Sequence, residues 1–134
     1  APMARAFCCA ERFYVLNRAG YYWRVRTGDN KSITQRLGEF ENLRDRMQSL
    51  QKTLKVLLGA IEAGQANNKN LLEFQLRVAS IDLQLHLPFV ASGDSQYDDL
   101  LKETAKQLLG DCGPEFWQRV QGRFAPVLKQ IVEG

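Results

Sequence analysis

The chain has 134 residues and a net charge of +3, from 18 Lys and Arg against 15 Asp and Glu. Hydrophobic residues make up 45% of it and charged residues 25%, a globular balance that excludes a disordered, fibrous or low-complexity chain. No apolar run approaches the ~18 residues of a membrane span, so we expect a single domain that does not enter a membrane.

The positive charge is confined to the N-terminal quarter of the chain. Residues 1–31 hold six basic and two acidic residues, a net charge of +4, whereas the rest holds 12 basic and 13 acidic residues, a net charge of −1. The same quarter contains six of the thirteen aromatic residues. We therefore treat residues 1–31 as a basic, aromatic N-terminal arm and residues 32–134 as the second part of one compact domain.

The arm contains a pattern typical of a β-hairpin over residues 12–27. Phe13–Leu16 and Tyr21–Val25 are rich in β-branched and aromatic residues, and the connection between them ends in Gly20. An isolated hairpin is marginally stable in water, so the face that carries Trp23 must pack against something. Either the rest of the chain or another subunit is expected to cover it.

From Ser32 the hydrophobic period changes to that of a helix. Apolar residues follow one another at spacings of three and four, which predicts an amphipathic helix from Ser32 to about Ala63; they are Ile33, Leu37, Phe40, Leu43, Met47, Leu50, Leu54, Leu57 and Ile61. Gly38 weakens the first turns, which leaves a start near Glu41 as the alternative.

The remaining segments predict a helical fold. Residues 70–87 alternate as strands do, yet their length and the Pro88 that follows favour a helix. The loop Ser92–Ser95 contains a cap for a third helix, and Pro114 suits the first turn of a fourth helix that is kinked at Pro126. The fold class is therefore mainly α: a four-helix bundle-like domain with one long N-terminal helix, preceded by a small β-hairpin arm.

Catalytic chemistry has little support in the sequence. His86 is the only histidine, and no second ligand or nucleophile accompanies it. Cys8, Cys9 and Cys112 are an odd set with one adjacent pair, which indicates a reduced, cytoplasmic protein. Cys112 precedes a predicted helix, where the pKa of a thiol can fall, but a plain loop cysteine is favoured. We expect no enzyme activity, cofactor or metal.

The leading hypothesis is a non-catalytic protein-interaction or oligomerisation module. A helix from Ser32 to Ala63 would be ~48 Å long, whereas a compact body of this size is ~36 Å across, so part of the hydrophobic seam would need a partner. A helix that starts at Glu41 would be only ~35 Å long and would fit within one subunit. The expected contacts, with a second copy or another protein, are Leu43, Met47, Leu50, Leu54, Leu57 and Trp23.

Two alternatives come from other residues. Tyr22, Arg24 and Arg26 on the hairpin provide stacking and charged groups, so nucleic-acid binding is the second hypothesis. Phe89, Phe116 and Trp117 suggest a small-ligand pocket among the later helices, which is the third.

Overall fold

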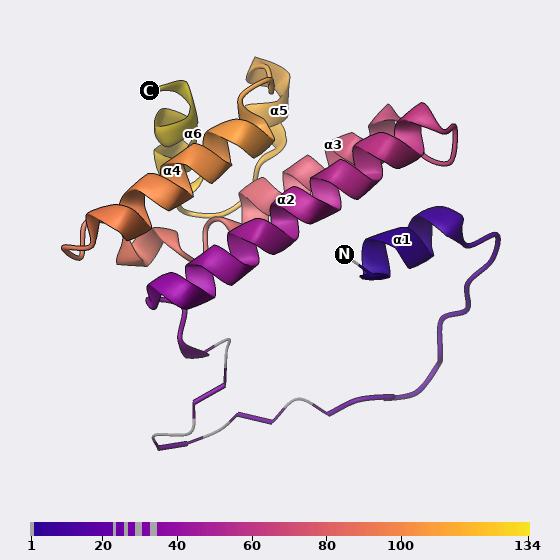
Figure 1. The fold of residues 1–134 in the computed structure, drawn as a ribbon, viewed down its shortest axis with the longest axis horizontal. Helices are drawn as coiled ribbons and strands as arrows, with labels where there is room; N and C mark the ends of the chain where they lie inside the picture. The colour runs from indigo at the N-terminus through magenta and orange to yellow at the C-terminus, as the bar shows by residue number, and fades with distance from the viewer. Residues whose placement is uncertain (1, 23, 26, 29–30, 33–34) are drawn as a thin grey trace.

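The computed structural model describes residues 2–22, 24–25, 27–28, 31–32 and 35–134, and in these residues the protein is mainly helical (Figure 1). The mainly-α prediction is therefore confirmed. A π-helical turn, η2 (Val78–Asp82), continues α3, and a short 3-10 turn, η3 (Leu87–Phe89), follows it. The α-helices are α1 (Pro2–Cys9), α2 (Phe40–Glu62), α3 (Asn68–Arg77), α4 (Ser95–Leu109), α5 (Pro114–Arg119) and α6 (Ala125–Glu133).

Helix α2 is the long amphipathic helix, but it begins at Phe40 rather than at Ser32. Gly38 lies just before this start, and the ring of Phe89 is so close to it that an added Cβ would stand 2.8 Å from Cδ1. With 23 residues the helix is ~35 Å long, the shorter of the two expected lengths. It ends at Glu62, next to the predicted Ala63, and Gly64 follows with a φ of +74°, which suits glycine.

The core lies where α2, α4, η2 and α6 pack together. Helix α2 contacts α3 and α4, while α6 contacts both α4 and η2. Figure 1 shows α2 crossing the body diagonally, with α4 and α6 above it. The buried hydrophobic residues join these elements into one cluster, which includes Leu43, Met47, Leu50, Val78, Leu83, Tyr97, Leu101, Leu108, Phe116, Trp117 and Leu128.

The ambiguous segment 70–87 is helical in the structure, and no strand occurs there. Helix α3 starts earlier than expected, because Asn67 caps it. The Asn67 side chain accepts from the Asn70 backbone N–H, and the Asn70 side chain accepts from the Asn67 backbone N–H. The segment is not one regular helix, because it widens into the π-turn η2 and then breaks before η3. Asp94, which lies in the loop expected to contain the cap, caps α4 by accepting from the N–H groups of Gln96 and Tyr97.

The predicted fourth helix is two helices, α5 and α6, separated at residues 120–124. Gly122 stands in the break with a φ of +105°, and the side chain of Gln84 occupies the space beside it. The Gln84 amide donates to the Gln121 and Ala79 carbonyls, and its oxygen accepts from the Phe124 N–H. One buried glutamine therefore joins η2 to the start of α6. The four-helix bundle is not confirmed in its detail.

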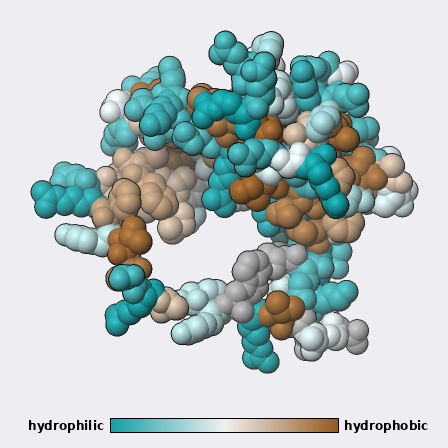
Figure 2. Space-filling view, turned by 180° about the vertical axis from the view of Figure 1, so that it is seen from behind, coloured by the Kyte–Doolittle hydropathy of each residue, from teal (hydrophilic) through white to brown (hydrophobic). Residues whose placement is uncertain are grey.

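The N-terminal part of the chain differs from what the sequence predicted. Helix α1, which we did not expect, packs on α2 through its half-buried Ala4 and Cys8. Residues 10–39 are called the extended segment below, and their described part runs beneath the helices in Figure 1. Seen from behind, an open space separates the described part of this segment from the body (Figure 2).

The hairpin expected over residues 12–27 is not confirmed, because the described residues there form no strand. Two strands without a third surface to cover them are marginal in water. Among the described residues, the large side chains of this region are mostly exposed, although the Phe13 ring meets Phe7 of α1 edge-on. Across the described residues, no helix combines the length and the apolarity that crossing a bilayer demands.

Candidate functional site

The extended segment presents its large side chains to solvent. Tyr14, Tyr21 and Tyr22 are 88%, 85% and 84% exposed, and Phe13, Val15, Leu16 and Val25 are exposed as well. Exposed apolar residues are usually scattered singly, so such a run in one short stretch is an unusual feature of the surface. We therefore take the extended segment as the candidate functional site.

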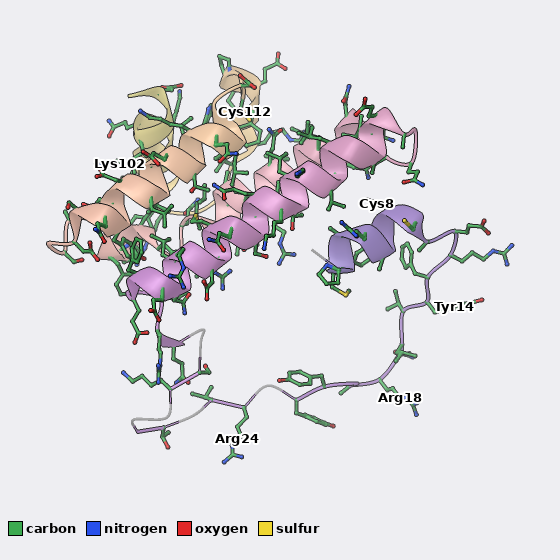
Figure 3. The ribbon with its side chains drawn as sticks, in the orientation of Figure 1. Cys8, Tyr14, Arg18, Arg24, Lys102 and Cys112 are labelled. Carbon is green, nitrogen blue, oxygen red and sulfur yellow. The ribbon has the colours of Figure 1, made fainter. Side chains whose placement is uncertain are left out.

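The residues predicted to contact nucleic acid lie in this segment. Tyr22 and Arg24 are both exposed, whereas Arg26 lies outside the described residues. Figure 3 shows the side chains of Tyr14, Arg18 and Arg24 pointing away from the helical body. The segment thus offers aromatic rings and guanidinium groups on its outer side. Trp23, the second contact predicted for a protein partner, also lies outside the described residues.

The other predicted interface residues are located elsewhere. Leu43 and Met47 are completely buried in the chain's own core, and Leu50 and Leu57 are also buried. Leu54 is half-buried and packs against that core. The uncovered seam that we expected on the long helix is therefore not found at these positions, because α2 is short enough for α3 and α4 to cover it. The exposed hydrophobic residues that remain to be explained lie mainly in the extended segment.

Buried polar groups fix the end of the extended segment to the body. The Tyr97 hydroxyl donates to the Leu37 carbonyl at 2.8 Å, and His86 Nδ1 lies 2.9 Å from the Tyr97 hydroxyl. His86 Nδ1 also lies 3.2 Å from the Leu37 carbonyl oxygen, so an N–H at this position has two acceptors, the Tyr97 hydroxyl oxygen and the Leu37 carbonyl. His86 is fully buried, and its contacts help to hold this junction.

Burial decides the protonation of both side chains. It lowers the pKa of His86 to about 4, with the Leu37 carbonyl opposing the shift and the charge of Arg46 adding to it. Burial likewise raises the pKa of Tyr97 to about 12, helped by the nearby Asp98 carboxylate. Both groups are therefore neutral at pH 7, which suits a structural junction rather than proton transfer.

A charged cluster lies next to this junction. Asp82, at the end of the π-turn, accepts from Arg46 Nη1 at 3.2 Å and pairs with Arg77 Nε at 3.7 Å. The cluster lines a cavity of about 450 Å³, and Val25, Gln35 and Leu37 from the extended segment form another part of its wall. This cavity lies between the extended segment and the helical body, next to the junction at Leu37.

The remaining candidates show no active-site chemistry. Burial, followed by the charge of Asp111, raises the pKa of Cys112 to about 11, so this thiol is not activated as a cysteine before a helix can be. Phe116 and Trp117 pack edge-on at 5.3 Å within the core, while Phe89 packs against Gly38. No group of three His, Cys, Asp or Glu suited to a metal occurs in the part of the chain that the structure describes.

Sequence reasoning missed the partners of the buried polar residues. Asp82 was a usable signal, because it is the only acid in residues 78–87, a stretch rich in apolar residues. Its partner Arg46 is 36 positions away, so no local pattern connects the two. The Tyr97–Leu37 bond spans 60 positions and was equally hidden.

Comparisons with protein-family models, with curated proteins and with solved structures found no match.

Proposed function

We propose that the chain is a non-catalytic interaction module that binds a partner protein through its extended segment. The observation that carries this proposal is the solvent exposure of its aromatic side chains, led by Tyr14, Tyr21 and Tyr22. Four such aromatics can bury roughly 600 Å², most of the ~800 Å² that each side of a stable protein–protein interface contributes. A second copy of the chain is one form that the partner can take.

The composition of the segment supports a protein partner in particular. Tyrosine and arginine, together with tryptophan, are the residues that contribute most to binding at protein interfaces. Lysine, which interfaces contain less often, occurs once in residues 1–31. The aliphatic Val15 and Leu16 are also exposed, and such side chains fit an apolar surface better than they fit a base stack.

The hairpin predicted over residues 12–27 belongs to this bound state. We propose that Phe13–Leu16 and Tyr21–Val25 pair as strands when the partner supplies the covering surface that the chain lacks. Binding would then order the segment, and the free chain would keep the extended form.

The test is a capture experiment with the full chain. A photo-reactive residue replaces Tyr14 in an otherwise unchanged chain, where it is expected to cross-link one protein or a second copy of the chain. The cross-link is expected to disappear when Tyr21 and Tyr22 are also changed to Ser. Light scattering over a range of concentrations separates self-association from a different partner. Cross-linking that is unchanged in the tyrosine variant, with a monomer at every concentration, contradicts the proposal.

Nucleic-acid binding is the second candidate function. It is favoured by Arg18 and Arg24, whose side chains point outward (Figure 3), and by the exposed Tyr22, which is close to Arg24 in the sequence. An electrophoretic shift of a single-stranded oligonucleotide at about 50 mM salt, lost in Arg24→Ala with Arg26→Ala, would support it. Cross-linking to a protein that persists after nuclease treatment would favour the first candidate instead.

A further inference from the structure

A cationic cleft lies between α1 and α2, next to the place where the two helices pack together. Its volume is about 730 Å³, and its lining residues are Pro2, Arg5, Lys52, Lys55, Val56 and Gly59. Three of these six residues are cations, contributed by two helices that are far apart in sequence, and none of the six is acidic. The cleft therefore concentrates positive charge in a space large enough for a small ligand.

Nothing in the described chain neutralises these three cations. The ion pairs of the described residues involve other basic side chains, namely Arg36, Arg44, Arg46, Arg77 and Lys129. Along α2, the positions four residues from Lys52 are Gln48 and Val56, and those four residues from Lys55 are Gln51 and Gly59.

Lys52 and Lys55 are three residues apart on one helical face, so they repel each other without a local carboxylate to compensate. The sequence thus maintains an unfavourable charge arrangement at this place.

Gly59 is a second local cost at the same place. Glycine weakens a helix interior, and this one has no positive φ that would require it. An added Cβ at Gly59 would meet nothing within 4 Å, so packing within the chain does not require it either. The open backbone surface instead allows another molecule to approach α2 closely, beside the two lysines.

The same residues also border a second hollow. A cavity of about 700 Å³ is lined by Lys52, Lys55 and Gly59 as well, and extends to Gln107 of α4. Glu62, the last residue of α2, also lines this second cavity, so its lining is less positive than that of the cleft between α1 and α2. The two lysines therefore border both cavities, and of these two only the cavity next to α1 has no acidic residue in its lining.

From this arrangement we infer that the α1–α2 cleft binds a small ligand with a multiply charged phosphate group. Two local features that weaken α2 coincide in one cleft, and such departures from local consistency are expected where a protein binds something. Val56 and Pro2 provide an apolar wall for the rest of the ligand. The inference is independent of the partner of the extended segment.

The test is a titration of the full chain with sodium tripolyphosphate at low salt, followed by calorimetry and by amide NMR shifts. Saturable binding is expected, with the largest shifts at Lys52, Lys55 and Gly59. Lys52→Ala with Lys55→Ala is expected to weaken binding about tenfold or more, because charge-assisted contacts are lost. Gly59→Ala should also weaken it while raising the melting temperature of the chain.

The matched control is Lys102→Ala with Lys106→Ala, which removes the same charge from the exposed face of α4. Binding is expected to survive in this variant. Adenosine triphosphate and vesicles that contain a phosphoinositide then identify the source of the phosphate. Absence of tripolyphosphate binding, or an equal loss in the control variant, would overturn the inference. Binding to an oligonucleotide alone would overturn it as well, because a polyanion needs no built cleft.

Discussion

Two tyrosines show how the helical body, residues 40–134, differs from the extended segment. Tyr97 is 1% exposed, its ring lies in the core, and its hydroxyl donates to the Leu37 carbonyl. Tyr21 is 85% exposed, and the described residues around it form no strand. The chain itself determines the position of the first residue, whereas the second is available to another molecule. Substitutions should therefore affect stability in the body and binding in the segment.

The largest difference is expected between Leu43→Ala and Tyr14→Ala. Leu43 is completely buried at the contact of α2 with the core, so its truncation leaves a cavity and should lower the free energy of unfolding by about 2–5 kcal/mol. Tyr14 is exposed, and its loss should change that free energy by less than about 0.5 kcal/mol. Urea denaturation measures both values. Similar losses would mean that the segment is packed on the body, and the comparison would fail.

A glycine pair separates the effect of backbone strain from that of packing. Gly122→Ala is expected to cost about 2–4 kcal/mol, because it combines a positive φ with a clash against the buried Gln84. Gly64→Ala is the matched control: its φ is also positive, but an added Cβ meets nothing, so the cost should be about 1–2 kcal/mol. Thermal unfolding checks the difference. Equal costs would show that Gln84 can move aside.

The junction between the two regions should respond to pH through His86. Its pKa is about 4 in the folded chain and about 6.5 when unfolded, so the unfolded state binds more protons between these values. Stability from this group is complete above about pH 6.5 and declines as the pH falls toward 4. Between about pH 7 and pH 5 the free energy of unfolding should fall by about 2 kcal/mol. In His86→Gln the decline should be smaller over the same interval; an unchanged slope would contradict the assignment.

Local signals in the sequence identified much of the body. The three- and four-residue spacing of Leu43, Met47 and Leu50, the helix end near Ala63 and the cap in the loop Ser92–Ser95 depend on residues within one or two turns of helix. The break between α5 and α6 was not readable, because it depends on Gln84, a residue 38 positions before Gly122 in the chain. Helix α1 was not predicted because it has only eight residues, too few to establish a helical period.

The candidate site was readable only in part, for a related physical reason. Composition alone placed the exposed aromatic and basic residues in the N-terminal quarter, and the structure leaves the described ones in solvent. Strand formation there depends on a covering surface, which local β-propensity cannot supply. The meeting of Arg5 with Lys52 and Lys55 depends on how α1 packs against α2, and no pattern in the sequence shows it.

The smallest effect on stability, and the sharpest test of the comparison, is expected from Tyr21→Ser with Tyr22→Ser. Both rings are exposed, so the free energy of unfolding should stay within about 0.5 kcal/mol of wild type. Hydrogen–deuterium exchange gives the complementary measurement. In the free chain, the described amides of residues 12–22 lack helix or strand partners and should exchange rapidly, whereas those of α2 should be protected. Slow exchange of residues 12–22 in the free chain would show that they are already paired, and the segment would then belong to the body.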